Sequence, residues 1–512
     1  MQSLEALHIE ILSLIVYHLR DLPPPHTPHF SDQPPPSQAL ASYATVSRKW
    51  QAVVEQYSFA AVKTTSSNLA QLKEVIAGCA RRRDNLRALF YQIDLPAYTK
   101  NQNHRFERRQ DHEANVVAFQ AGIQELWAEL SRWGLGENPA SGLRLVLTAE
   151  AAVPFPVWED RWVYPKHSLT LDAPSVDPGL PMLPCVSLFQ LAETGRSVHP
   201  AAIRTLLDTL VNLRDLHLKI WPIRRRHRAL VAEHMTALAQ ALESPALSRL
   251  RILRIWAGQH TPLDHSYDTA LGRDPDYPDG DVLNQAVYKL MQQSLQELYL
   301  EEAWMISPAL WGANDQGVAN KGEDSTLLPY LRIVSVRFPL MAYDGRWFYT
   351  GDPREIPPLE GDTPPPDWEE SDSDAASSFG GFPDEIPYYR DGVLNGDQPE
   401  HPWMVRPDPS TFHPVARAIT SAVLKMPQLQ HLRVGTTETG GEGYEIDLEY
   451  VQPGIKADSI PSAHQTPEQR GRRRYVVSLG LDAQWDVPDD IREPMERRIS
   501  ADRGGEVIFY KM

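Results

Sequence analysis

Apolar residues recur at helical spacing near the start of the chain. The first stripe consists of Leu7, Ile11, Leu12, Ile15 and Leu19. The second stripe follows a proline-rich connection and consists of Leu40, Val46, Trp50, Val53 and Val54. Each spacing places its apolar residues on one side of a helix, so we predict two short amphipathic helices. A pair this small buries little apolar surface, and it therefore needs a larger domain or a partner to pack against.

A second pattern, close to Leu-x-x-Leu-x-Leu, recurs along the chain. It occupies residues 213–218, 250–255, 295–300, 331–336 and 429–434. Helical periodicity precedes four of these motifs, at 203–210, 230–242, 282–291 and 418–424. We predict helices that turn into strands, with the leading leucine at the corner and the next two apolar positions pointing inward. Helices between successive strands favour parallel pairing, and units of this kind bury their apolar sides only by stacking.

Further elements lie before and after these motifs. Before them we predict helices at 68–76 and 115–133 and strands at 85–95 and 143–148. After them we predict strands at 444–450, 475–479 and 504–510 and a helix at 488–499. The last group is expected to form a cap that covers the final apolar surface of the stack.

The chain divides into four segments of different composition. Residues 1–60 contain the helix pair and a proline-rich inserted loop at 21–38, and residues 61–343 contain most of the helix and strand units. Residues 344–410 are acidic, rich in proline and poor in aliphatic side chains, so we expect a disordered insert there. Residues 411–512 hold the last unit and the αβ cap.

The helix pair resembles an F-box. In the first helix Leu7, Glu10, Ile11, Leu12, Ile15 and Leu19 match that family's pattern, and in the second Val46, Ser47, Arg48 and Trp50 match it. His8 stands where proline is usual, and the link between the helices is long. The resemblance implies docking to the Skp-type adaptor of a cullin ubiquitin ligase. The adaptor-facing residues would be Leu7, Ile11, Leu12, Ile15, Leu19, Val46 and Trp50.

The later motifs resemble the degenerate leucine-rich repeats that follow the F-box in many fungal proteins. Their spacing of 36 to 45 residues for the middle motifs is longer than that of regular repeats. The asparagine that usually follows the strand is absent. The resemblance implies an α/β fold in which an irregular helix and strand solenoid follows the F-box, and an ordinary α/β domain with leucine-rich strands is the alternative. We expect target-binding residues just past the strands, at Trp221, Arg224, Arg225, Arg226 and Trp256.

Charge and cysteine content narrow the possible partners and compartment. The net charge of -17 argues against binding to nucleic acid or to an anionic membrane. Cys79 and Cys185 form no disulfide framework, which fits a reducing compartment. We find neither a secretory signal nor an apolar run of about 20 residues. The expected location is therefore cytoplasmic, nuclear or both.

Known catalytic motifs are missing from the sequence. We find no His-Glu-x-x-His, no Gly-x-Ser-x-Gly and no phosphate-binding glycine loop. The acidic run at 274–281 lacks the register of a calcium loop. We therefore expect a protein without enzymatic activity, cofactor or metal. The resemblance to an F-box implies that it acts as the substrate-recognition subunit of an SCF-type ubiquitin ligase. Two alternatives stay open: a scaffold whose N-terminal helices only cap its own domain, and an enzyme with an unrecognised site.

Overall fold

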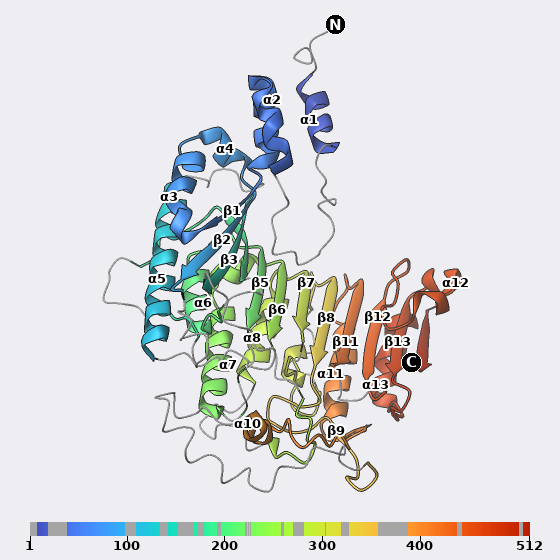
Figure 1. The fold of residues 1–512 in the computed structure, drawn as a ribbon. Coiled ribbons are helices and arrows are strands. Elements are labelled where there is room, and N and C mark those ends of the chain that lie inside the picture. Colours follow the sequence, from blue (N-terminus) through green and yellow to red (C-terminus); the bar gives the residue numbers. More distant parts are fainter. Residues whose placement is uncertain are drawn as a thin grey trace.

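The computed structural model gives the chain an α/β fold (Figure 1). It describes residues 8–18, 38–97, 109–133, 142–151, 168–171, 179–191, 196–220, 223, 225, 227–257, 261–269, 281–302, 304–318, 327–356, 388–437, 443–500 and 505–511.

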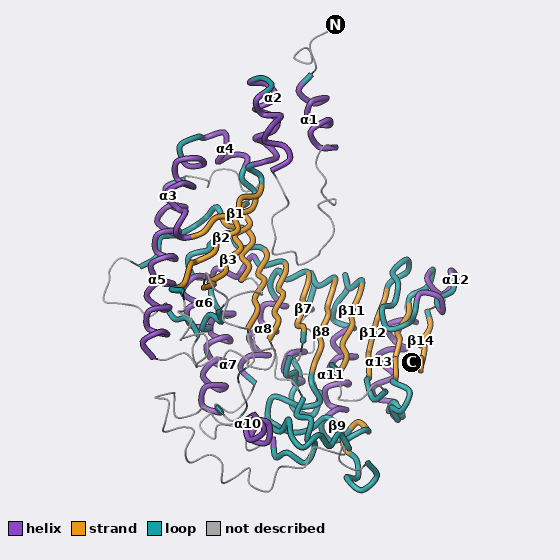
Figure 2. The backbone as a smooth tube through the Cα atoms, in the orientation of Figure 1, coloured by secondary structure: helices purple, strands orange, loops and turns teal. Residues whose placement is uncertain are grey.

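One sheet of 12 strands runs through the described part of the chain (Figure 2). Its strands, in spatial order, are β1 (Ala61–Thr65), β2 (Ala88–Leu95), β3 (Leu143–Ala151), β4 (Val186–Leu191), β5 (Asp215–Ile220), β6 (Ile252–Ala257), β7 (Glu297–Glu301), β8 (Ile333–Phe338), β11 (His431–Thr436), β12 (Ile446–Val451), β13 (Arg474–Leu479) and β14 (Glu506–Lys511). Spatial order thus follows chain order. Pairing is parallel from β1 to β11, antiparallel from β11 to β12 and from β12 to β13, and parallel again from β13 to β14.

The helices connect the strands or lie at the ends of the sheet. The α-helices are α1 (Ile9–His18), α2 (Arg48–Ser58), α3 (Leu69–Leu72), α4 (Ala80–Asn85), α5 (Arg109–Arg132), α6 (Pro200–Leu207), α7 (Arg228–Leu242), α8 (Val282–Gln292), α10 (Tyr388–Asn395), α11 (Phe412–Val423), α12 (Pro467–Arg470) and α13 (Asp489–Ser500). Short 3-10 segments include η2 (Gln38–Thr45), η7 (Pro245–Arg249), η9 (Pro308–Trp311) and η10 (Ser462–His464).

The repeated leucine motif forms a helix-to-strand corner, as predicted. The leading leucine is buried in every motif, at Leu213, Leu250, Leu295, Leu331 and Leu429. The two apolar positions that follow it in each strand are buried as well. The residue after each corner leucine donates its backbone N–H to a backbone carbonyl in the preceding unit. Arg251 N, for example, donates to Arg214 O at 2.6 Å. Each corner therefore joins one unit to the next.

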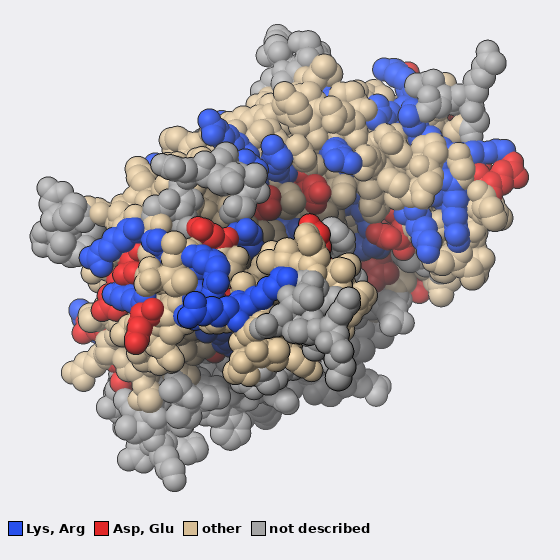
Figure 3. All heavy atoms as spheres, turned by 90° about the horizontal axis from the view of Figure 1, so that it is seen from above, with Lys and Arg blue, Asp and Glu red and all other residues tan. Residues whose placement is uncertain are grey.

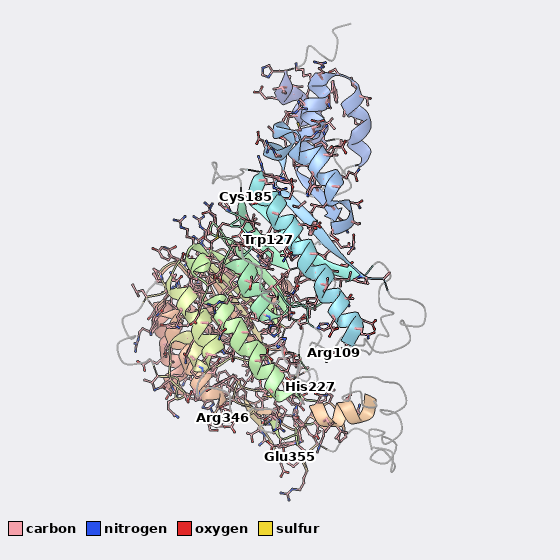
Figure 4. All side chains as sticks on the ribbon, turned by 90° about the vertical axis from the view of Figure 1, so that its left-hand side faces the viewer. Arg109, Trp127, Cys185, His227, Arg346 and Glu355 are labelled. Carbon is pink, nitrogen blue, oxygen red and sulfur yellow. The ribbon has the colours of Figure 1, made fainter. Side chains whose placement is uncertain are left out.

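Most of the longer helices pack on one side of the sheet and share a core with it. That core contains the inward residues of the strands together with the buried residues of α5, α6, α7, α8, α11 and α13. In α5, the Trp127 indole donates to Thr209 at 2.9 Å, which joins this helix to the end of α6 (Figure 4). The opposite side of the sheet is called the open face below.

The C-terminal segment extends the sheet beyond the last leucine motif and covers part of both of its faces. Residues 455–460 fold over the open face, where Ala457 and Ile460 pack on Val451 of β12 and Val476 of β13. On the other side, α13 packs against α11 and β14. The α/β class, the parallel strand order and the helix and strand content of this cap agree with the sequence-based expectation, whereas β4 was not predicted.

The region from 344 to 410 differs from the predicted disordered insert. Residues 344–356 and 388–410 are structured, and β9 (Tyr349–Thr350) pairs antiparallel with β10 (Arg406–Pro407). Phe348 and Tyr349 are buried in the main core. The prediction is therefore wrong for these two stretches, because the aromatic residues at the ends of the segment supply the apolar surface that its middle lacks. Residues 357–387 lie outside the described residues.

Candidate functional site

The N-terminal helix pair has a core of its own. Leu12 and Val16 of α1 pack with Trp50, Val53 and Val54 of α2 and with Leu40, in a cluster separate from that of the sheet. Ser47 caps α2 and accepts a hydrogen bond from Trp50 N at 3.3 Å. Figures 1 and 4 show the pair at one end of the molecule, beyond β1 and α4.

The pair also exposes large apolar side chains. Ile11, Leu14 and Tyr17 follow one another at three-residue spacing, on the side of α1 opposite to Leu12 and Val16. Leu14 is the most exposed of them, at 59%. We name Ile11, Leu14 and Tyr17 the helix-pair surface; Ile9 and Val46 are exposed as well. Exposed apolar side chains that gather in this way are typical of a protein-binding surface.

The structure divides the predicted adaptor-facing residues into two groups. Leu12 and Trp50 are core residues, and Ile15 is half-buried beside them. Ile11 and Val46 are exposed. Leu7 and Leu19 lie outside the described residues. Sequence reasoning missed Ile9, Leu14 and Tyr17, although α1 is apolar on nearly all sides, which is the signal that could have revealed a second contact side.

Ion pairs attach the helix pair to the sheet domain. The buried carboxylate of Glu55 in α2 accepts hydrogen bonds from Arg82 at 2.8 Å and from Arg81, both in α4. The Arg82 guanidinium also lies 4.8 Å from the centre of the Phe59 ring. Burial opposes ionisation of Glu55, but the hydrogen bonds from Arg82, Gln51 and Arg81 outweigh it and lower its pKa. Part of the basic run at 81–83 is therefore a structural link.

Polar and aromatic side chains line the middle of the open face. On β5 to β8 this face presents Asp215, His217, Lys219, Ile252, Arg254, Trp256, Glu297, Tyr299, Glu301, Ile333, Ser335 and Arg337, all of them half-buried. Their alternation with buried residues follows from the two-residue period of a strand. Figure 3 views the molecule from above and shows acidic and basic side chains intermingled in a hollow near its middle.

Direct contacts order these open-face side chains. The Arg254 guanidinium lies 4.2 Å from the centre of the Tyr299 ring and 3.9 Å from Glu297. The Tyr299 hydroxyl donates to Glu297 at 3.0 Å. Burial raises the pKa of Glu301, with Arg254 acting in the opposite direction, and the Trp256 indole donates a hydrogen bond to this carboxylate. The cluster is aromatic and of mixed charge.

A tight ion-pair group lies on the open face at the turn to antiparallel pairing. Asp447 of β12 accepts from Arg337 at 2.7 Å and from two nitrogens of Arg433 at 2.6 and 3.0 Å. A β-carbon on Gly435, between these strands, would lie 1.5 Å from the Asp447 carboxylate oxygen. Glycine is therefore required there for the carboxylate to approach both arginines. Two-point contacts of this kind fix orientation as well as adding energy.

The predicted target-binding residues fall in different places. Trp256 lies on the open face, and Trp221, Arg224 and Arg226 are outside the described residues. Arg225 is buried, where its guanidinium donates to Asn395 O and lies 3.1 Å from Asp397. Its position favours a structural role over target contact. Sequence reasoning could not foresee this, because Asp397 is 172 residues away in the chain.

Arg225 belongs to a loop cluster at the carboxyl ends of the parallel strands, formed by residues 261–269, 339–356 and 393–411. His265 is buried within it and accepts from Met404 N at 2.8 Å. The Trp403 indole donates to Ser266 at 3.1 Å. Burial lowers the pKa of His265 to about 4, and nearby His401 adds to the effect. The ring is therefore neutral at pH 7, and its acceptor nitrogen holds the two segments together.

Three possible metal ligands meet beside the cap, at His431, Glu449 and Asp458. The Asp458 amide donates to one oxygen of Glu449 at 2.7 Å, and His431 lies 2.7 Å from the same oxygen. The other oxygen accepts from the Ser459 amide at 2.9 Å and from the Ser459 hydroxyl. Burial opposes ionisation of Glu449, but these hydrogen bonds prevail and lower its pKa. The carboxylate thus anchors the loop that covers β12 and β13.

Among the described residues, no helix has both the length and the apolar character needed to cross a membrane. Neither a protein-family model nor a curated protein matches this sequence. Inference about function therefore depends on the helix-pair surface and on the open face.

Proposed function

We propose that this chain is the substrate-recognition subunit of an SCF-type ubiquitin ligase. The helix pair would dock the Skp-type adaptor, and the helix and strand region would hold a target protein. One observation carries the proposal: the helix-pair surface exposes Ile11, Leu14 and Tyr17 on the side of α1 that its own core does not use. These residues lie within the stretch whose sequence resembles an F-box.

The separate core of the helix pair supports docking over capping. A cap would add its apolar residues to the end of the sheet core, as residues of α13 do at the other end. Leu12, Val16 and Trp50 instead form a cluster of their own. The link to the sheet domain runs through the Glu55 ion pairs, which hold the pair in place and leave the outer side of α1 accessible.

The open face is the surface that we propose for the target. Strands in chain order with helices on one side support an irregular leucine-rich-repeat-like solenoid. Trp256, Tyr299 and Arg254 gather on the other side, and tryptophan, tyrosine and arginine are the residue types that contribute most to protein interfaces. Chemistry would come from other subunits, and this chain would act by bringing the target close to the ubiquitin donor.

Co-expression with a Skp-type adaptor tests the proposal. The diagnostic variant is Leu14→Asp, because Leu14 is 59% exposed and a charge there leaves the fold intact. Val117→Asp is the matched control, since Val117 is 65% exposed on α5, which does not belong to the helix pair. We expect wild type and Val117→Asp to co-purify with the adaptor in equal amounts. Leu14→Asp should lose the adaptor, because a carboxylate cannot be buried unpaired in an apolar interface.

Failure to bind the adaptor would contradict the proposal. If well-folded wild type elutes without the adaptor at micromolar concentrations of both proteins, the helix pair is not an adaptor-docking module. The alternative, a scaffold whose N-terminal helices only cap its own domain, would then hold. Leu12→Asp is unsuitable for this test, because Leu12 is fully buried and its loss would unfold the pair.

A further inference from the structure

Strand β14 forms the edge of the sheet at its C-terminal end (Figure 2). It pairs with β13 on one side, and no strand of the described part of the chain pairs with its other side. The edges of sheets carry backbone donors and acceptors that are free to pair with another chain. The outer side of β14 is therefore a candidate surface for pairing with another chain.

The hydrogen bonds to β13 show which residues of β14 face outward. Glu506 N donates to Arg473 O at 3.1 Å, so Glu506 faces β13. Because backbone groups point to alternate sides along a strand, Val507, Phe509 and Lys511 direct their N–H and C=O groups away from β13. The outer side of β14 thus offers a regular ladder of amide groups.

The side chains of β14 do little to block pairing along this edge. Phe509 is 51% exposed, and Val507 and Ile508 are half-buried. Natural edge strands are usually protected by proline, by inward-pointing charges or by bulges. The stretch 507–510 contains neither proline nor charge, and its register with β13 is regular. The composition favours pairing.

We infer that β14 pairs antiparallel with β14 of a second copy of this chain, so that the sheet continues across a two-fold axis. Each face of the sheet in one copy must continue as the same face in the other copy. Because side chains alternate between the two faces along a strand, opposed residues must both have even numbers or both have odd numbers. The register centred on Ile508 meets this condition. It sets Val507 opposite Phe509 of the second copy, where the two residues exchange both backbone hydrogen bonds, and Ile508 opposite its own equivalent.

Self-pairing in this register suits the sequence of the strand. The two symmetry-related pairs of Val507 with Phe509 are apolar, and so is the central pair of Ile508 residues. Opposed aromatic and β-branched residues are among the favourable cross-strand pairs. The register centred on Phe509 would instead set Val507 opposite Lys511. A second copy is therefore the occupant that we commit to, and the inference does not depend on the proposed function.

Light scattering during sizing of the full chain tests the pairing. We expect wild type to elute with twice the mass of one chain and to dissociate on dilution. Phe509→Lys should elute as a monomer of unchanged circular dichroism, because lysine on an edge strand opposes pairing. Val117→Lys, which changes a side chain of similar exposure on α5, should stay dimeric. Wild type that is monomeric at every concentration up to its solubility limit would overturn the inference.

Disulfide trapping tests the register. Opposed residues in a non-hydrogen-bonded antiparallel pair have their α-carbons about 4.5 Å apart, close enough for a disulfide. In a Cys79→Ser background we expect Ile508→Cys to form a covalent dimer on mild oxidation, and Phe509→Cys to form none. Burial raises the pKa of the remaining Cys185 thiol to about 11, so that it does not compete. Trapping of Phe509→Cys alone would overturn the proposed register.

Discussion

Two buried histidines and one half-buried histidine are held neutral by their surroundings. Burial lowers the pKa of His217 to about 3, and the nearby arginines Arg254 and Arg144 add to the effect. Burial likewise lowers the pKa of His234 to about 4, with His199 beside it, its ring centre 4.2 Å away. His265 in the loop cluster behaves in the same way. In each case the folded chain binds a proton less readily than the unfolded chain does.

This difference predicts that acid destabilises the fold. The pKa of histidine in the unfolded chain is about 6.5, so below that pH the unfolded chain takes up protons that the folded chain does not. We expect the free energy of unfolding to be constant near pH 7 to 8 and to fall between pH 6.5 and about 4. Each such histidine contributes up to about 1.4 kcal/mol per pH unit.

Urea unfolding at several pH values, on wild type and on His234→Gln, measures this effect. The variant should show a shallower decline, because it lacks one of the groups that titrate only on unfolding. His8→Gln is the control, since the side chain of His8 is exposed. Parallel pH curves for wild type and His234→Gln would contradict the assignment.

At the scale of elements, the corner between helix and strand is the repeated structural feature. Five corner leucines are buried under the turn that joins one unit to the next, and the amide after each corner bonds to the preceding unit. The apolar side chain and the backbone bond act together, because the burial of the leucine fixes where the strand begins. At β4 the corner is irregular: residues 183–188 read Leu-x-x-Val-x-Leu and Leu183 is buried, but the register with β3 shifts and Leu188 is only half-buried.

We expect Leu295→Ala to destabilise the sheet domain by about 3 kcal/mol, within the 2 to 5 typical of a buried leucine. Leu295 is fully buried at the corner before β7, so its loss leaves a cavity between two units. Val211→Ala, at a 41% exposed position near the corner before β5, should change stability by less than about 0.5 kcal/mol. Urea denaturation midpoints at equal slope measure both. Equal effects of the two variants would refute a packing role for the corner.

At the scale of the whole molecule, polar contacts join the small core of the helix pair to the main core of the sheet. The helix pair contributes a small cluster around Leu12 and Trp50, whereas one continuous core extends from β1 to α13. Glu55 connects the two, because it is buried in α2 and bonded to Arg81 and Arg82 of α4. We therefore expect the helix pair to open locally at a lower free energy than the sheet does.

Glu55→Gln should weaken this connection specifically. Hydrogen bonds to charged groups contribute about 1.5 to 3 kcal/mol, and the variant removes the charge that two arginines share. We expect amide hydrogen exchange to quicken in α1 and α2 and to stay unchanged in β5 to β8. Glu10→Gln, which alters an exposed carboxylate of α1, should exchange like wild type. Faster exchange throughout the sheet, or in neither region, would show that Glu55 is not the connection.

Local periodicity was enough to predict the corner leucines, the helices before them, the parallel pairing and the strands and helix that follow residue 443. These features depend on neighbours a few residues apart, and the periods of 3.6 and 2 that fix them are visible in the chain. The same reasoning placed Leu12 and Trp50 on an apolar side of the helix pair. It could not distinguish those core residues from the exposed residues Ile11 and Val46. An apolar stripe shows that a helix has an apolar side, but it does not show which residues of that side contact the second helix.

Contacts between distant residues needed the folded chain. The Asp447 group brings together Arg337 and Arg433 over Gly435, and these positions meet only because β8, β11 and β12 are neighbours in the sheet. The pairing of Arg225 with Asp397 and the ordered ends of the acidic segment have the same origin. Side-chain periodicity records which residues turn inward, but the order in which units stack decides which polar groups face one another.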